Sequence, residues 1–563
     1  MTPHPSTDAL LGMLPQYLDL VFAPFTLPKS RILVMMRTAE GATHPTMTVA
    51  RAEYERNLDD CTLFSDVRVE TSDGTALDVS TVEAHRIVFG DMDACLTFAG
   101  PEALSFGAKT PCRVRYTVDG VITTREVDSD TSVILPGLPG QDVTLATAAA
   151  HSTALAETRA VWSEWMHRCP RVRDDLQSMT ALCWWVLGAN IVELPGQAGA
   201  RAVVPSKIGY VGLWQWDAYF IAVGLRHGDP ELAREQLQLA FAFISDEGQL
   251  PDVVHDQGIL SSSTDLPPVD LANLRRMGSA VADPDAPVPL TKPPLAAWAL
   301  EKVLDVEDAP EFASAAWEVV SRSQDWWFSR SDSDSDGMPE YGHPYSSGLD
   351  DSPIFDGPLP VATPDLGAYL VVQDRLLARQ AALSGDLPQA QRCNLRAERT
   401  LEKLCSLWST SRSRFCISFE GELLESYTAV SLIPLLTGEL PAHMSASMVE
   451  SLSDESQFGT PWGVPTVAHS DPDFSPERMW RGPVWININS LIIEGLDKSG
   501  HHVEAERLAE QTVQLVIAGG GPNEYYNPYT GRKAATSTTS FGWSAAWFID
   551  LAVRLSGPHK RIY

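Results

Sequence analysis

The segment SSGLDDSP, residues 346–353, places the adjacent carboxyl groups of Asp350 and Asp351 in a turn after Gly348. Glycine lets a backbone approach a ligand closely, and a carboxyl group held there could donate a proton to a reacting oxygen. Acids in turns also commonly accept hydrogen bonds from nearby backbone amides. The pair by itself therefore leaves a catalytic and a purely structural interpretation open.

The segment GLWQWDAYF combines indoles with a carboxyl group. It contains Trp214, Trp216, Asp217 and Phe220. The apolar face of a sugar ring stacks on an indole, and a carboxylate accepts hydrogen bonds from sugar hydroxyls. The same residues would also suit the buried start of a helix. We therefore interpret this segment as a candidate sugar subsite only in combination with others.

The segment PERMWRGPVWININ carries Arg478, Trp480, Arg481 and Trp485 at the expected start of a helix. A helix N-terminus offers backbone N–H groups to a ligand. The alternative is a cation–π contact between arginine and tryptophan inside the core.

The segment GGGPNEYYNPYTGRK follows three glycines and a proline with Glu524 and Tyr525. Flanking glycines would let this carboxylate point into a cavity. A phosphate loop is disfavoured, because GGGP is not followed by Gly-Lys-Ser/Thr. A surface loop is the alternative, although the run YYNPY is unusually aromatic for one.

Together these segments describe a pocket with stacking aromatic rings and two carboxyl groups on separate loops, Asp350 and Glu524. Glycoside hydrolysis needs such a pair, because one acid protonates the leaving oxygen while the other activates water or attacks directly.

A run of acids, SDSDSDGMPE, places Asp332, Asp334 and Asp336 before a glycine and Glu340 shortly after it. This spacing resembles the first half of a calcium-binding loop. The twelfth position of such a loop would be His343, which cannot supply the usual bidentate carboxylate. A structural calcium and a solvated acidic turn both remain open.

Bulk properties exclude several classes of protein. A length of 563 residues predicts at least two domains. A net charge of −31 disfavours binding to nucleic acid or to anionic membranes. No apolar run approaches the roughly 20 residues of a transmembrane helix, and the first residues do not read as a secretory signal. We expect a cytoplasmic protein with eight free thiols, since no cysteines form CxxC pairs.

The elements that position these residues fall into two parts. Residues 1–145 alternate apolar and polar side chains, and the alternation is interrupted by Asp73-Gly74 and Asp119-Gly120. An Asp-Gly pair between alternating runs is a strong hairpin signal. Several such units predict an N-terminal β-sandwich, and PGLPG at 136–140 lies near its end.

Helical periodicity dominates residues 146–563. In GDPELAREQLQLAFAFI, Asp229 is a predicted N-cap and Pro230 the first helical residue. A second helix is predicted to open at Pro483. Paired helices joined by long loops on one side predict an α/α toroid, whose long loops, 246–292, 329–361, 454–484 and 519–541, would carry the site. A solenoid is disfavoured, because no repeat of fixed period is found.

These segments, in this order, resemble glycoside hydrolase family 63 and its trehalase-like relatives over most of residues 205–556. WQWDAYF looks like the family element W-x-W-D-x-x-F, and TKPPLAAWAL resembles its T/S-Q-P-P-L. SSGLDDSP is similar to E-S-G-x-D-N-S-P. WRGPVWININ is close to identical to the family's Trp-Arg-Gly-Pro element. NEYYNPYTG and FGWSAAW resemble its last two elements.

The resemblance implies an (α/α)6 barrel, often preceded by a β-domain, and exo-acting hydrolysis of an α-linked sugar with inversion of configuration. Asp350 matches the general acid and Glu524 the general base. Trp216 and Asp217 match positions that hold the non-reducing sugar, and Arg481 and Trp485 match the wall of the site.

This chain departs from the family elements at three positions. The Glu of E-S-G-x-D is Ser346, the Asn after the acid is Asp351, and the Gln of Q-P-P is Lys292. A second acid could raise the pKa of Asp350 or compete with it for the role of proton donor. Lys292 could meet an anionic or differently hydroxylated aglycone.

The sequence therefore predicts a mainly α protein, with a β-sandwich at 1–145 and an (α/α)6 barrel at 146–563, that acts as an inverting α-glycosidase on a small glucoside or mannoside. No cofactor is required, and a homo-oligomer is compatible with the sequence. The alternatives are a carbohydrate-binding protein that has lost catalysis and a trehalase- or phosphorylase-type enzyme. The predicted substrate-binding residues are Trp214, Trp216, Asp217, Phe220, Lys292, Asp351, Trp480, Arg481, Trp485, Tyr525 and Trp543.

Overall fold

The computed structural model describes residues 4–557 apart from 39–43, 55, 92, 195, 197–198, 257 and 260–289. Most of the predicted long loop 246–292 thus lies outside the described residues. The chain divides into two units. The first comprises Met1–Pro195, Gly199–Gly212 and Thr539–Ala545, and the second comprises Gly196–Ala198, Leu213–Thr538 and Ala546–Tyr563.

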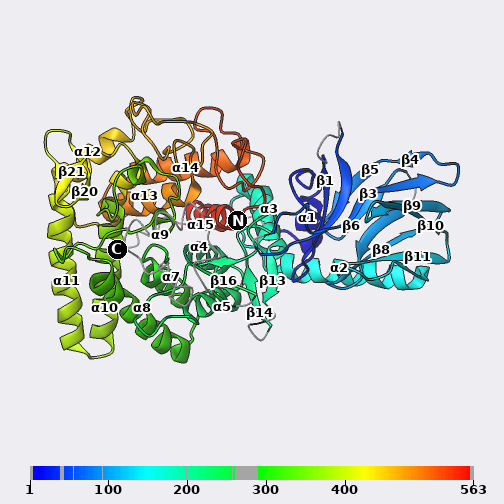
Figure 1. The fold of residues 1–563 in the computed structure, drawn as a ribbon, viewed down its shortest axis with the longest axis horizontal. Helices are drawn as coiled ribbons and strands as arrows, with labels where there is room; N and C mark the ends of the chain where they lie inside the picture. Colours follow the sequence, from blue (N-terminus) through cyan, green and yellow to red (C-terminus); the bar gives the residue numbers. More distant parts are fainter. Residues whose placement is uncertain are drawn as a thin grey trace. The chain divides into compact units, whose positions relative to one another are not determined.

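The first unit is built on two antiparallel six-stranded sheets (Figure 1). One sheet has the order β1(Ile32–Arg37), β2(Thr46–Arg51), β3(Thr62–Thr71), β9(Cys112–Val118), β10(Val121–Val127), with β4(Ala76–Leu77) beside β3. The other has the order β12(Thr144–Thr147), β11(Thr131–Pro136), β8(Ala103–Ala108), β7(Ala94–Phe98), β6(Arg86–Phe89), β5(Val79–Glu83).

Both predicted hairpins are confirmed. Strand β3 pairs with β4 across the turn that contains Gly74, and β9 pairs with β10 with Val118 opposite Val121. Asp119 and Gly120 both have positive φ angles, 50° and 76°. This is the backbone that a two-residue hairpin turn requires, and it explains why Asp-Gly stands there.

Helices follow the strands within the same unit. α2(Ala148–His167) and α3(Asp174–Ala189) pack against each other through two stacked indole pairs, Trp162 with Trp185 and Trp165 with Trp184. α1(Thr7–Gly12) and the hairpin of β13(Ile191–Leu194) and β14(Ala200–Val203) complete the unit. Strands thus give way to helices at Ala148, and α2 and α3 belong to the same unit as the strands.

The second unit is mainly helical. Its long helices are α4(Gln215–Leu225), α5(Pro230–Phe241), α7(Ala296–Leu304), α8(Pro310–Arg330), α10(Pro364–Leu383), α11(Leu387–Ser406), α12(Ala442–Ser451), α13(Ile486–Lys498), α14(His502–Ala518) and α15(Gly542–Ser556), whose first residues belong to the first unit. Short elements are α9(Pro344–Ser347), η3(Pro353–Phe355), η4(Ala429–Thr437), β15(Leu213–Trp214), β16(Val253–His255), β17(Gly258–Ile259), β18(Trp408–Ser409), β19(Arg414–Phe415), β20(Ile417–Phe419) and β21(Glu422–Leu424).

Helices adjacent in the sequence pack as pairs in this unit: α4 with α5, α7 with α8, α10 with α11 and α13 with α14. A second set of contacts joins the first members of these pairs to one another and to η4: α4 to α7, α7 to α10, α10 to η4 and η4 to α13. α15 lies against α4, where Gly224 leaves room for the backbone of Ala546.

Two local predictions about helix starts have different outcomes. The side chain of Asp229 accepts a hydrogen bond from the Leu232 amide and Pro230 begins α5, as predicted. The prediction that a helix opens at Pro483 is wrong, because α13 begins at Ile486. The intervening Val484 is held extended by two backbone hydrogen bonds with Tyr526.

All eight cysteines are free thiols, and seven of them are buried. Within the described ranges, no helix combines the length and hydropathy of a transmembrane segment. The cytoplasmic location stays a prediction.

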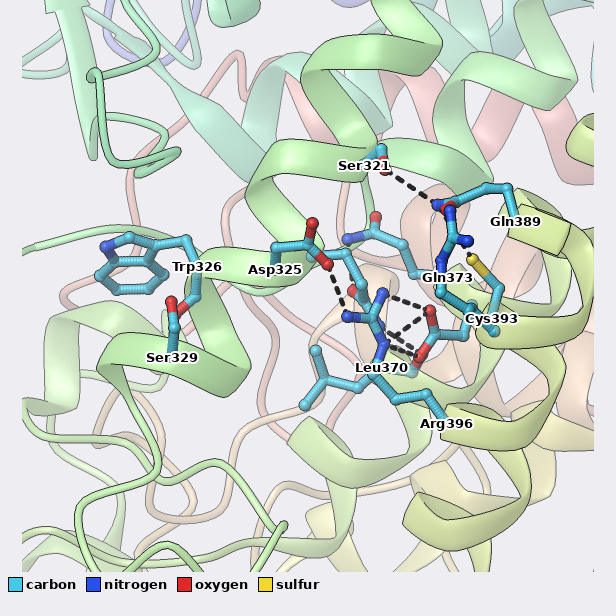
Figure 2. A network of polar contacts seen from close by, with 12 residues as sticks. Ser321, Asp325, Trp326, Ser329, Leu370, Gln373, Gln389, Cys393 and Arg396 are labelled. Atoms are coloured by element: carbon cyan, nitrogen blue, oxygen red, sulfur yellow. Dashed lines mark hydrogen bonds and ion pairs between the residues drawn. The ribbon is translucent and has the colours of Figure 1, made fainter.

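Arg396 joins three helices of the second unit through ion pairs with two aspartates (Figure 2). Arg396 of α11 donates from Nε and Nη2 to Asp374 of α10, at 2.8–3.1 Å, and from Nη1 to Asp325 of α8 at 2.6 Å. The Asp374 side chain is fully buried, whereas that of Asp325 is 65% exposed. Water can therefore take the place of the arginine at Asp325 but not at Asp374.

We predict that Arg396→Leu lowers the free energy of unfolding by about 3–5 kcal/mol, because it leaves the Asp374 carboxylate buried without a partner. The matched control Asp325→Ala removes the exposed partner of the same arginine and should cost at most about 1 kcal/mol. Urea unfolding of the two variants measures the difference. Equal losses would contradict this account.

Candidate active site

The turn that carries the adjacent acids is fixed by a glycine. Gly348 ends the short helix α9 with a φ of 71°, which side chains other than glycine adopt at a cost. A Cβ atom at this position would also collide with the indole of Trp216. The turn that carries Asp350 therefore packs directly on Trp216 at the start of α4.

Asp350 is surrounded by other carboxyl groups. Its Oδ1 atom is buried and has no hydrogen-bond partner among the described residues. Burial raises the pKa of Asp350 to about 7, the charge of Lys292 lowers it, and the charges of Asp252, Asp351 and Glu524 raise it further. Near neutral pH this carboxyl group can therefore hold a proton and release it.

Glu524 lies in the loop between α14 and α15, and its backbone is pinned on both sides. The Glu524 amide donates to the carbonyl of Thr538 at 2.9 Å, and the Thr538 amide donates back to Glu524 Oε2 at 3.0 Å. The Tyr525 amide donates to Ser537 Oγ at 3.0 Å. Glu524 is only 3% exposed, so its carboxylate is buried and held in place.

The charge of Glu524 acts on both Asp350 and Asp217. Burial raises the pKa of Asp217 well above its usual range, Lys292 lowers it, and Glu524 and Asp252 raise it. Carboxyl groups that influence one another in this way share one electrostatic environment. The structure thus brings the two predicted catalytic acids and the predicted sugar-binding acid together, although they come from three distant segments.

Lys292 is buried and engaged by the protein itself. Its Nζ atom lies 2.9 Å from Asp252 Oδ1 and donates to the carbonyl of Tyr345 at 2.7 Å. Burial alone would lower the pKa of Lys292, but Asp252, Asp350 and Asp217 together raise it. Asp252 was missed by the sequence analysis, since a single Asp after a proline in a loop carries no motif.

Asp351 points away from its neighbour. Its Oδ1 accepts the Trp480 amide at 2.9 Å, and its Oδ2 accepts Arg478 Nε at 3.0 Å. Arg481 Nη2 donates to Asp356 Oδ1 at 2.5 Å. The two predicted arginines are thus held by carboxylates, and Asp351 joins the acid turn to the Trp480 loop.

Four of the predicted aromatic residues form a continuous row with Tyr525. Trp216 contacts Phe220 and Trp480, with ring centroids 5.4 and 6.1 Å apart. Trp480 stacks on Trp485 at 3.6 Å, and Trp485 stacks on Tyr525 at 4.7 Å. Because Trp480 and Trp485 are at most 2% exposed, their contacts chiefly hold the loops together.

The two remaining predicted indoles lie elsewhere. Trp214 is half-buried at the N-cap of α4, so it keeps more exposed surface than the indoles of the row. Trp543 belongs to the first unit, where its ring packs edge-on against Phe541.

The predicted calcium site is only partly assembled. Carboxylate oxygens of Asp332, Asp334 and Asp336 lie within 4.8 Å of one another. Asp336 also binds Lys403 at 2.9 Å. Glu340 is not in this group, since it is buried and its carboxylate accepts hydrogen bonds from Ser333. A structural calcium at the three aspartates stays a prediction.

Comparisons with known proteins give a matching family model and several relatives. The model of the mannosylglycerate hydrolase MGH1-like glycoside hydrolase domain matches residues 210–544. A mannosylglycerate hydrolase of Rubrobacter radiotolerans is 28% identical over 421 residues, which cover 61% of this chain and 91% of that protein.

Two solved structures share the fold. The family 63 mannosylglycerate hydrolase of Thermus thermophilus, in complex with glucose, has a TM-score of 0.55 and 23% identity and covers 65% of this chain and 98% of its own. A bacterial glucoamylase in complex with acarbose has a TM-score of 0.54 and 11% identity and covers 95% of this chain and 94% of its own.

We predict that Gly348→Ala lowers stability and displaces the Trp216 ring. The change combines a strained backbone, about 1–2 kcal/mol, with a clash that costs about 1–3 kcal/mol more. Gly337→Ala is the matched control, because its φ is 89° but its Cβ would meet open space. Thermal unfolding and near-ultraviolet circular dichroism compare them, and an equal effect would refute the packing argument.

Proposed function

This chain belongs to the mannosylglycerate hydrolase MGH1-like glycoside hydrolases of family 63, and from this we propose that it is an inverting, exo-acting α-glycosidase. It is a glycoside hydrolase; the linkage, the stereochemistry and the residue roles are the proposal. The substrate would be a small α-glucoside or α-mannoside, such as a glycosyl conjugate of glycerate.

The observation that carries the proposal is the pair of buried carboxyl groups of Asp350 and Glu524, whose charges act on one another. Asp350 is the group whose pKa is raised to about 7, which suits a general acid. Glu524 is fixed by the Thr538 amide through Oε2. An inverting enzyme needs its two carboxyl groups roughly 6.5–9.5 Å apart, with room for one water.

In the proposed reaction, Asp350 gives its proton to the glycosidic oxygen as the bond from that oxygen to the anomeric carbon breaks. Glu524 takes a proton from a water molecule whose oxygen attacks the anomeric carbon from the opposite face. The products are the free alcohol and a sugar of inverted configuration. Both proton transfers are made by carboxyl groups, so the proposal requires no cofactor.

Neighbouring residues would hold the sugar. Asp217 is buried, and the charge of Glu524 acts on it, so a carboxyl group there can bind the hydroxyls of a pyranose. The half-buried indole of Trp214, one residue before α4, offers surface for a sugar ring. The highly buried Trp480 and Trp485 would support the wall of the site from behind.

We also propose the architecture that this chemistry uses. Among the described residues, α4, α7, α10, η4, α13 and α15 would form the inner ring of an (α/α)6 barrel, because the first five contact one another in this order and α15 returns to α4. Arg554 of α15 also binds Asp497 of α13, which supports closure. The two sheets of the first unit would pack as a β-sandwich.

Two alternative functions, a phosphorylase and a binding protein without catalysis, predict different outcomes. A phosphorylase needs cations for phosphate, yet Arg478 and Arg481 already bind Asp351 and Asp356. A binding protein without catalysis was suggested by Ser346, which stands where the family element has Glu. The Ser346 side chain instead faces the Thr291 amide, 3.5 Å away, and so has a structural contact of its own.

Anomer-resolved proton NMR on α-glucosyl and α-mannosyl disaccharides and on glycosyl-glycerates tests the proposal. We expect the β-anomer of the sugar to appear first. Initial release of the α-anomer would exclude inversion, phosphate-dependent release of a sugar phosphate would indicate a phosphorylase, and a thermal shift without product would indicate a binding protein.

We predict that Asp350→Asn and Glu524→Gln each lower kcat roughly a hundred- to ten-thousand-fold, because each removes a proton transfer. Sugar binding, measured by calorimetry, should persist in both variants. Asp351→Asn is the control from the same turn, since its side-chain oxygen can still accept a hydrogen bond from the Trp480 amide. Its kcat should fall much less. Wild-type turnover in Asp350→Asn would reject the assignment.

We predict that kcat/KM falls above about pH 7, because Asp350 must carry its proton in the free enzyme and its pKa is about 7. The decline should approach about tenfold per pH unit. A pH profile with the most reactive substrate measures this limb. A rate that stays constant up to pH 9 would show that Asp350 is not the acid.

A further inference from the structure

Lys292 joins the segments that carry the proposed acid and the sugar-binding residues. Through Asp252, whose carbonyl accepts the Gln215 amide at 2.9 Å, it is linked to the start of α4. Through the carbonyl of Tyr345 it is linked to α9, five residues before Asp350. With 6% of the residue exposed, the ammonium is held by the protein instead of being presented to solvent.

The surroundings of this ammonium are strongly acidic. The groups whose charges act on Asp350 or Lys292 are Asp217, Asp252, Asp351 and Glu524. Asp351 is neutralised by Arg478 on its other side. His343 also faces this region, and burial together with the charge of Lys292 lowers its pKa to about 4, so it is neutral near pH 7. Among the described residues, Lys292 is thus the cation whose charge opposes that of these carboxylates at Asp350.

The family element has glutamine at this position. Glutamine could also donate a hydrogen bond to the Tyr345 carbonyl, but it would bring no charge. The lysine of this chain therefore adds an electrostatic contribution to a contact that a neutral side chain could make. The two contributions, holding the turn and supplying charge, can be separated by substitution.

We propose that Lys292 is a positioning residue that anchors the turn of Asp350 through Tyr345 and Asp252 and supplies a positive charge to the buried acids of the site. The inference rests on the proposed function for its consequence in catalysis. It does not make Lys292 a binding site for an anionic aglycone, because its ammonium already binds Asp252.

The signs of the expected effects are opposite for the two partners. Lys292 stabilises the carboxylate of Asp350, so Lys292→Gln should raise the pKa of Asp350 by about one unit or more. Asp252 destabilises that carboxylate, so Asp252→Asn should lower the same pKa. Lys292→Arg keeps the charge and should leave it near the wild-type value. Lys292→Gln introduces the residue of the family element, which favours correct folding.

The pKa of Asp350 is measured in the whole protein by carboxyl-carbon NMR with isotope-labelled aspartate, and the signal is assigned by its loss in Asp350→Asn. This measurement needs no substrate. The pH profile of kcat/KM is then recorded for the same variants, and its alkaline limb should move up in Lys292→Gln and down in Asp252→Asn. In the double variant Lys292→Gln/Asp252→Asn, the pKa of Asp350 and the alkaline limb should return close to the wild-type values. Because this variant has no carboxyl group at position 252, that result would also exclude that Asp252 takes up the proton in place of Asp350.

Each result tests one part of the inference or the proposed function on which it rests. Opposite shifts of the NMR titration support the inference even if no glycoside is hydrolysed, and that second finding would reject the proposed function alone. An unchanged titration in Lys292→Gln, or the same shift in Lys292→Arg as in Lys292→Gln, would overturn the electrostatic role. Titration shifts with an unmoved alkaline limb would show that Asp350 is not the group that limits the rate.

Discussion

The burial of several carboxyl groups around one ammonium is the constraint on which the site depends. Each carboxylate loses hydration when it is buried, and like charges near one another make ionisation less favourable still. The structure meets this cost with Lys292, which lies between Asp252 and the turn of Asp350. Burial, together with the remaining excess of negative charge, raises the pKa of Asp350 to about 7. The raised pKa of Asp350 is thus a property of the whole group.

The adjacent acids Asp350 and Asp351 show how backbone direction separates two identical side chains. Asp351 turns toward Arg478 and the Trp480 amide, where hydrogen bonds stabilise its charge. Asp350 turns toward the buried carboxyl groups, and its Oδ1 stays without a protein partner among the described residues. The two adjacent acids therefore lie in different surroundings, and burial raises the pKa of Asp350 to about 7.

The loops that carry these side chains are held without regular secondary structure. The loop that carries Trp480 pairs with the loop that carries Glu524 through Val484 and Tyr526, and both join the aromatic row that includes Phe220. Backbone hydrogen bonds fix the direction of the loops, and ring packing fixes their separation. Such support is needed because a displacement of about 1 Å in a catalytic group can cost a hundredfold in rate.

The sequence by itself determined what depends on near neighbours. The Asp-Gly hairpins, the Asp229 cap and the ordered motifs that identify the family are local, so they could be read without coordinates. Three features depended on partners far along the chain: the start of α13 at Ile486, the contacts of Lys292 and the ion pair that Asp252 makes with it. Only the tertiary structure could decide these, because burial and charge proximity exist only after distant segments have packed together.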